Sequence, residues 1–322
     1  MFRMNPPLSL SRRLAGAPTP LAGLALGLAS LGWCAENLGG FDGRAQLLGA
    51  SLALALLCVL AGKFLLHPHL LREDLAHPVI GSLLPTSSMT TMLIAKALSA
   101  YLPVITQGVW LLAVTAHLGL LLSFIQHRAR SFRLNHLLPS WFVPPVGIIV
   151  AALTCPSGEF LWLARLLLAF GLLSLAVLLP LMLYRLVFGS EIPDPAKPTL
   201  AILAAPASLA LAGYLSVSEQ PSPALVALLF GVAVLLTLVV WLTLLRLVRL
   251  PFSPGFSAFT FPMVIGATAQ FKLAQHLAAQ GSWAEDVVHI ETLARIELGV
   301  AGLVVGYVCL RYLLFFRQPR LA

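Results

Sequence analysis

Charged side chains are scarce in this chain. Only 10% of its 322 residues are Asp, Glu, Lys or Arg, whereas 59% are hydrophobic. A soluble domain usually carries about 25% charged residues, so this chain has too little polar surface to cover itself in water. The composition excludes an ordinary water-soluble globular protein and favours a protein that uses the lipid bilayer as its solvent.

The sequence also lacks the signatures of catalysis, cofactors and nucleic-acid binding. Its four cysteines are scattered without CxxC spacing, which predicts neither a metal site nor a disulfide framework. No Walker motif, dinucleotide fingerprint, HExxH motif or nucleophile elbow is present. The net charge of +8 lies in short clusters between apolar runs and forms no continuous basic face. We therefore expect no cofactor, no enzyme activity and no nucleic-acid partner.

Histidines offer two further alternatives. A lipid-modifying membrane enzyme would need polar residues clustered at one interface, and His117, His127 and His136 are too dispersed for that. His67 and His77 flank a charged stretch that could hold a metal, but we interpret this stretch as a solvated loop.

Long apolar segments are what the chain has in abundance. A membrane-spanning helix needs roughly 20 mostly apolar residues. Ten such segments are expected in a single transmembrane domain over residues 1–322, and the first is interpreted as a retained helix instead of a cleaved signal peptide. The expected spans are residues 18–36, 46–66, 79–100, 103–125, 139–156, 159–187, 199–217, 222–248, 256–279 and 292–316.

The distribution of basic residues predicts the orientation of the chain. With ten spans, fifteen of the 20 Lys and Arg residues fall on the side that holds both termini. Cytoplasmic loops carry an excess of Lys and Arg, so both termini are predicted to be cytoplasmic in a multi-pass protein of the cell membrane.

Prolines recur at nearly regular intervals. Pro85, Pro144, Pro206 and Pro262 lie in the third, fifth, seventh and ninth expected spans, 59, 62 and 56 residues apart, and a similar step back leads to a glycine-rich stretch with Gly27. Proline removes a backbone donor and kinks a helix. Equal spacing predicts five helical hairpins with quasi-fivefold symmetry. Five kinked helices would line a pore, and the other five would face lipid.

Several short motifs resemble one known family. They are Pro18-Thr19 with Gly23 and Gly27, His77-Pro78-Val79 with Thr90-Thr91-Met92-Leu93, Pro139-Ser140-Trp141-Phe142-Val143-Pro144, Ala204-Ala205-Pro206 with Tyr214-Leu215-Ser216, and Ser257-Ala258-Phe259-Thr260-Phe261-Pro262. In this order they are similar to the tellurite-resistance/dicarboxylate transporter family, which includes bacterial TehA and the plant slow anion channel. The chain departs from that pattern in its first inner helix, where Ala25 replaces a proline, and at Pro85, which lies about one turn early.

The resemblance implies the ten-helix, quasi-fivefold fold, a homotrimer with one pore in each subunit, and a phenylalanine gate on the ninth helix. Phe261 is the matching residue. A large apolar ring beside a kink can close a narrow pore sterically, and apolar constrictions also gate by dewetting.

Other residues on the inner helices are candidates for the pore lining. Lys272 and Lys96 could concentrate anions near the outer mouth, although long basic side chains near helix ends also extend to the membrane interface. Hydroxyl groups near the kinks could bind free carbonyls or an anion, and an aromatic ring could equally pack against the outer helices. The remaining candidates are Thr90, Ser140, Thr260 and Phe142.

The sequence favours a channel for small inorganic or organic anions. Its inner spans contain no convincing carboxylate at mid-membrane, where a proton-coupled carrier commonly has one. The alternative is a secondary carrier or exporter for a C4-dicarboxylate, sulfite or tellurium oxyanion, all of which the resemblance permits.

Overall fold

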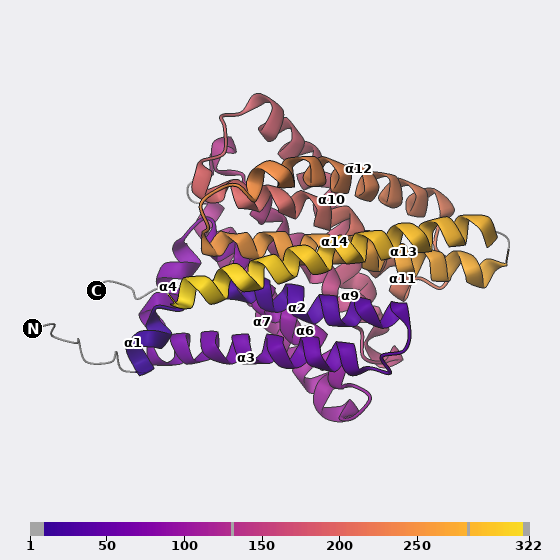
Figure 1. Cartoon of the computed structure of the whole chain (residues 1–322), viewed down its shortest axis with the longest axis horizontal. Coiled ribbons are helices and arrows are strands. Elements are labelled where there is room, and N and C mark those ends of the chain that lie inside the picture. The colour runs from indigo at the N-terminus through magenta and orange to yellow at the C-terminus, as the bar shows by residue number, and fades with distance from the viewer. Residues whose placement is uncertain (1–9, 130–131, 282–283, 318–322) are drawn as a thin grey trace, which may run out of the picture.

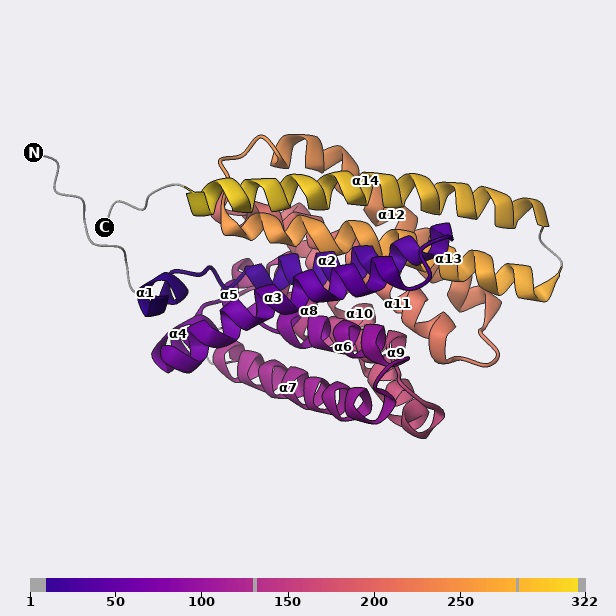
Figure 2. The same ribbon diagram turned by 60° about the horizontal axis from the view of Figure 1, so that its bottom comes forward.

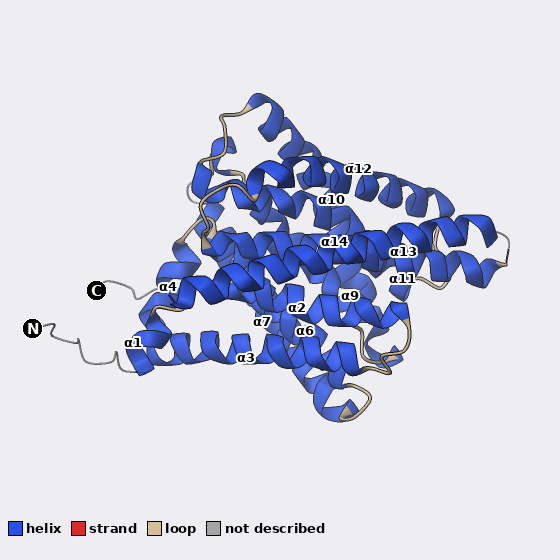
Figure 3. Cartoon of the chain, in the orientation of Figure 1, coloured by secondary structure: helices blue, strands red, loops and turns tan. Residues whose placement is uncertain are grey.

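The computed structural model describes residues 10–129, 132–281 and 284–317, and all regular structure within them is helical (Figure 3). The all-α prediction is therefore confirmed for this part of the chain. Most of the long helices run roughly along one axis (Figures 1 and 2). The elements are α1 Leu10–Ala15, α2 Leu21–Ala35, η1 Glu36–Leu38, α3 Arg44–Leu66, α4 Pro68–Ala76, α5 Ile80–Leu83, α6 Thr86–Leu98, α7 Pro103–Ala129, η2 Leu134–His136, η3 Pro139–Phe142, α8 Val143–Val146, η4 Gly147–Ile149, α9 Val150–Leu153, η5 Gly158–Phe160, α10 Leu161–Phe188, η6 Asp194–Ala204, α11 Ala205–Val217, α12 Pro223–Leu247, η7 Pro254–Phe259, α13 Thr260–Gln280 and α14 Ala284–Arg317, where η marks 3₁₀ helix.

Length and apolarity identify fewer spans than the ten expected. Among the described residues, seven helical segments are long and apolar enough to cross a membrane, or eight if the bent pair α4 and α5–α6 is one span. The region Pro139–Leu153 is apolar but short, and α13 carries Gln270 and Lys272 in its middle. The chain is thus a multi-pass membrane protein. The seven segments are Leu21–Leu38, Arg44–Leu66, Pro103–Ala129, Gly158–Phe188, Asp194–Val217, Pro223–Leu247 and Ala284–Arg317.

The helices differ sharply in how much of their surface is buried. In Asp194–Val217, 78% of the most apolar window is buried, compared with 28% in Gly158–Phe188. Helices α3, α7, α10, α12 and α14 present large apolar side chains at the outside of the bundle, such as Leu65, Val104, Leu173, Leu242 and Leu303. An apolar surface this extensive is unfavourable in water, so these helices face lipid.

Each of the four repeated prolines lies near the start of an α-helical segment. Pro85 caps α6, Pro144 and Pro206 are the second residues of α8 and α11, and Pro262 is the third residue of α13. The first amide groups of a helix have no intrahelical acceptor, so proline loses no hydrogen bond there. The chain reaches α8, α11 and α13 through 3₁₀ segments, and η6 is unusually long at 11 residues.

The segment between His67 and His77, interpreted as a loop, is helical. It contains α4, which begins at Pro68 and is strongly bent, by 103°, relative to the helix that follows. The proline-rich stretch before residue 199 is also partly helical, because η6 begins at Asp194. Helix α1 and the C-terminal end of α14 lie at the same end of the bundle (Figures 1 and 2).

Candidate functional site

A central cavity lies where the buried helices meet. Its walls come from α2, from α5 and α6, from the broken η3–η4 segment, from η6 and α11, and from η7 and α13. The cavity volume is about 50 Å³, and the lining is almost entirely apolar. The lining residues are Gly23, Leu26, Leu83, Thr86, Met89, Phe142, Val143, Val146, Gly147, Ile202, Ala205, Pro206, Leu209, Ser257, Ala258, Phe261 and Pro262.

Phe261 borders this cavity and is 7% exposed. It is the second residue of α13, directly after the 3₁₀ segment η7. The ring of Phe259 instead packs on Phe256, with ring centroids 4.8 Å apart, and both rings are fully buried. Of these three aromatic residues, Phe256 and Phe259 pack against each other, and Phe261 lies against the cavity.

Phe142 is the other predicted pore-lining residue that borders the cavity. Two of the repeated prolines, Pro206 and Pro262, are also in its wall, whereas Pro85 and Pro144 are not. The structure thus brings the predicted gate, one further predicted aromatic residue and two of the repeated prolines to one point.

Gly27 matters at a close approach between α2 and α13. A Cβ atom at Gly27 would lie far inside van der Waals contact with Cβ and Oγ1 of Thr260. The Thr260 hydroxyl donates hydrogen bonds to the carbonyl oxygens of Gly23 at 3.0 Å and Ser257 at 2.8 Å. Thr260 therefore joins α2 to α13 instead of facing the cavity.

The hydroxyl groups around Pro85 bind mainly to their own helix. The hydroxyls of Thr86 and Ser88 donate to carbonyl oxygens three residues earlier, and Thr90 donates to the Thr86 carbonyl, each at 2.7 Å. Ser140 accepts a hydrogen bond from the Ser82 hydroxyl at 2.7 Å. Thr90 and Ser140 do not line the central cavity.

His117 is fully buried between α6 and α8. Its Nε2 atom donates to the Pro144 carbonyl oxygen at 2.8 Å, and its Nδ1 atom lies 3.0 Å from the Ser88 hydroxyl. Helix α7 thereby fixes α6 and α8 relative to each other. Its partners lie on other segments, so no local pattern could have identified this role.

Lys96 lies on α6 and Lys272 lies on α13. The Lys272 ammonium lies 6.0 Å from the Trp33 ring centroid. Neither lysine lines the central cavity. Lys96 lies near the end of α6 and Lys272 just past the middle of α13, whereas the cavity residues of both helices lie near the starts.

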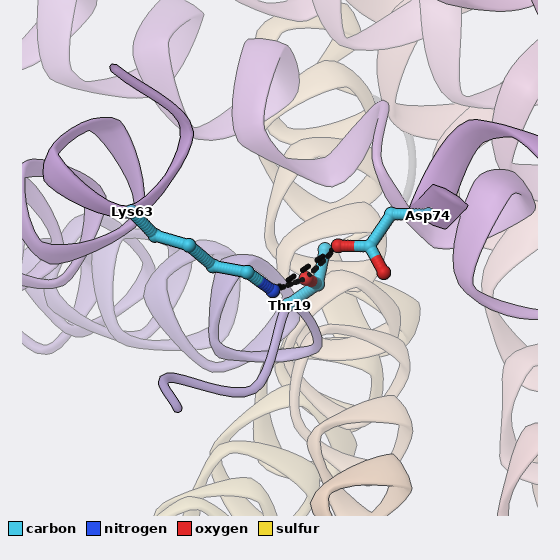
Figure 4. Close-up of polar contacts among 3 residues, drawn as sticks. All are labelled: Thr19, Lys63 and Asp74. Atoms are coloured by element: carbon cyan, nitrogen blue, oxygen red, sulfur yellow. Dashed lines mark hydrogen bonds and ion pairs between the residues drawn. The ribbon is translucent and has the colours of Figure 1, made fainter. Parts of the chain in front are cut away.

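A second cavity, of about 360 Å³, is lined by residues just before α2, around α5, and at the starts of η6 and η7. Leu83 borders both cavities. Here Thr19, Lys63 and Asp74 form a compact cluster (Figure 4). Lys63 Nζ lies 2.8 Å from Thr19 Oγ1 and 3.2 Å from Asp74 Oδ2, and Thr19 Oγ1 donates to the same carboxylate oxygen at 2.5 Å. The cluster connects α3, α4 and the residue pair before α2.

Glu297 is a second functional candidate that the sequence did not reveal. It belongs to α14 but is only 1% exposed, and its Oε2 atom accepts a hydrogen bond from Gln270 Nε2 of α13 at 2.5 Å. Its carboxyl group occupies the space left by the missing side chain of Gly266. A carboxyl group is therefore buried against α13, the helix that carries Phe261.

These features define a multi-pass membrane protein whose buried helices surround a narrow apolar cavity. Residues 21–313 match the SLAC1 family, described as voltage-dependent anion channel, and the chain belongs to this family. The predicted family membership is confirmed.

Two relatives from Methanocaldococcus jannaschii, both described as uncharacterized transporters, are 25% identical over 216 residues and 23% identical over 227 residues. The matches cover 59% and 62% of this chain and 62% and 66% of the relatives. The chain thus spans less than two thirds of the length of either relative.

Proposed function

We propose that this protein is an anion channel whose pathway passes through the central cavity. In this proposal ten membrane helices form five hairpins in a single transmembrane domain. The inner ring consists of α2, α5–α6, η3–α9, η6–α11 and η7–α13. The outer ring consists of α3, α7, α10, α12 and α14. The higher burial of the inner segments and the apolar outer surface support this division.

One observation carries the proposal: all five inner segments contribute residues to one cavity, and Phe261 is among them. These segments are far apart in the sequence, and ordinary packing of neighbouring hairpins would not bring all five to one point. A pathway along a shared axis accounts for their convergence, for the small residues Gly23, Ala205 and Ala258 in the lining, and for the family to which the chain belongs.

The size and lining of the cavity support a closed gate. At about 50 Å³ the central cavity is much smaller than the neighbouring cavity of about 360 Å³, so it forms a constriction. Apolar walls also disfavour a continuous water column. Phe261 is the proposed obstruction because its ring borders the cavity directly after a change of helix type.

Charge beyond the gate would select for anions. Both lysines, Lys96 and Lys272, lie on helices of the proposed inner ring, α6 and α13. Paired positive charge raises the local anion concentration and the rate of entry. We propose that these lysines flank the outer part of the pathway and favour small inorganic or organic anions.

The proposal includes a cellular setting. In this proposal the protein lies in the plasma or inner membrane, and both of its termini face the cytoplasm. The common end of α1 and α14 and the excess of basic residues support this orientation. A homotrimer with one pore in each subunit is proposed from the family resemblance.

A secondary carrier for a C4-dicarboxylate, sulfite or tellurium oxyanion is the second candidate. Two observations favour it: the relatives are described as transporters, and Glu297 places a carboxyl group inside the bundle. Carrier flux saturates with substrate and can couple to protons, whereas channel flux follows voltage at much higher turnover.

The test is anion efflux from liposomes that contain purified wild type, Phe261→Ala or Phe271→Ala protein. Phe271 is a matched control because it lies on the same helix, is also buried and does not border the cavity. We expect Phe261→Ala to raise efflux at least about tenfold, which corresponds to about 1.4 kcal/mol removed from the barrier. Unchanged efflux in a folded Phe261→Ala protein would contradict the gate. An equal increase in Phe271→Ala would attribute the effect to loosened packing.

A further inference from the structure

The contact between Glu297 and Gln270 leaves two hydrogen-bonding atoms without partners. Glu297 Oε2 accepts from Gln270 Nε2, but Glu297 Oε1 and Gln270 Oε1 are both buried and unpaired. Both are acceptors if the carboxyl group is ionised. Burying two acceptors without donors is unfavourable, because each loses its hydrogen bonds to water and forms none in the protein.

A single proton resolves both deficits. A protonated carboxyl group and a primary amide can form a ring of two hydrogen bonds, in which N–H donates to one carboxyl oxygen and O–H donates to the amide oxygen. The first of these bonds is present between Gln270 and Glu297. A proton on Glu297 Oε1 would supply the second, since the remaining acceptor belongs to the same amide group.

In the described part of the chain, Glu297 has no ion-pair partner that would replace that proton. Among the described residues, no basic side chain forms an ion pair with Glu297, and Arg295 on the same helix faces Glu291. Helix α14 packs mainly against α13, α2 and η7. Their titratable and charged side chains are Lys272 and His276 on α13 and Cys34 on α2, and η7 has none. A buried carboxylate without a cation favours its neutral form.

We propose that Glu297 and Gln270 form a proton-binding site that sets the position of the gate helix α13. Gly266, whose missing side chain receives the carboxyl group, lies four residues after Pro262 on that helix. Loss of the proton leaves a carboxylate beside an unpaired amide oxygen and breaks the fit at Gly266. The helix that carries Phe261 then shifts, so anion flux depends on pH. This effect on flux rests on the proposed function, whereas the proton site itself does not.

Infrared difference spectroscopy tests the site directly. The full-length wild-type protein in lipid is compared at acidic and alkaline pH, and the carbonyl stretch of a protonated carboxyl group is followed. We expect a band that is lost in Glu297→Gln and displaced in Gly266→Ala, where the new Cβ would occupy the space of the carboxyl group. Gly299→Ala is the matched control, because a Cβ at Gly299 meets no atom within 4 Å. A band that persists unchanged in Glu297→Gln would overturn the proposal.

Anion efflux in the Phe261→Ala background tests the coupling. We expect efflux to change with pH by up to about tenfold per unit, the limit for one titrating proton. In Glu297→Gln, efflux should stay constant at the level that the parent shows at acidic pH, because glutamine resembles the protonated acid. An unchanged pH profile in Glu297→Gln would overturn the coupling. Loss of the infrared band without any measurable efflux would support the proton site and contradict the channel.

Discussion

The buried cluster of Thr19, Lys63 and Asp74 allows a quantitative prediction. The side chains of Lys63 and Asp74 are only 7% and 15% exposed. Removing one partner of a buried ion pair leaves an uncompensated charge and typically costs 3–5 kcal/mol. Because this pair borders a cavity, we expect the lower end for Asp74→Ala, about 3 kcal/mol. At about 2 °C for each kcal/mol, the melting temperature would fall by roughly 6 °C.

A matched control lies on the surface of the same protein. Arg165 and Glu219 approach to 2.6 Å, closer than the buried pair, but their side chains are 46% and 81% exposed. Exposed ion pairs contribute about 0–1 kcal/mol, so Glu219→Ala should lower the melting temperature by no more than about 2 °C. The closer pair is thus predicted to matter less, because water and salt screen it.

The assay is thermal unfolding of purified protein in detergent, followed by fluorescence. It compares Asp74→Ala, Glu219→Ala, the single variants Lys63→Met and Asp74→Leu, and the double variant that combines these last two. The double variant should lose clearly less than the sum of the two single losses, because it removes both charges together. Equal small effects of Asp74→Ala and Glu219→Ala would refute the reasoning, as would strict additivity in the double variant.

Two other predictions concern the pathway. Gly27→Ala should destabilise the protein by about 1–3 kcal/mol, because the new Cβ collides with Thr260, whereas Gly108→Ala has open space and should be neutral in thermal unfolding. Replacing Lys96 and Lys272 together by methionine should lower anion efflux of the opened gate variant by about tenfold at low salt and much less at high salt, because salt screens exposed charges. A loss of efflux that is independent of salt would exclude an electrostatic role for the lysines.

Composition and short motifs are enough to predict the class and the family of this protein. The all-helical membrane class follows from composition, and the family follows from motifs distributed along the chain. The same motifs single out Phe261 and Pro262, and both residues border the central cavity. Their roles as gate and kink remain predictions.

Other features depend on contacts that no sequence pattern announces. The sequence marks Lys63 only as one of the basic residues expected on the cytoplasmic side, but its partner Asp74 lies on α4. From the sequence alone this helix is interpreted as a loop, because it is short and contains several charged residues. Glu297 lies on a helix with one exposed face, and only packing shows that it points inward toward Gln270. His117 likewise gains meaning only from its contact with the Pro144 carbonyl.

Current through planar bilayers under an anion gradient tests the central claim most directly, with wild type and Phe261→Ala compared. We predict a small wild-type current and a large, voltage-driven current in Phe261→Ala that reverses near the equilibrium potential of the anion. Absence of current in both proteins, together with saturable and pH-coupled uptake into liposomes, would contradict the channel and establish a carrier in which Phe261 lies at a substrate site or packs.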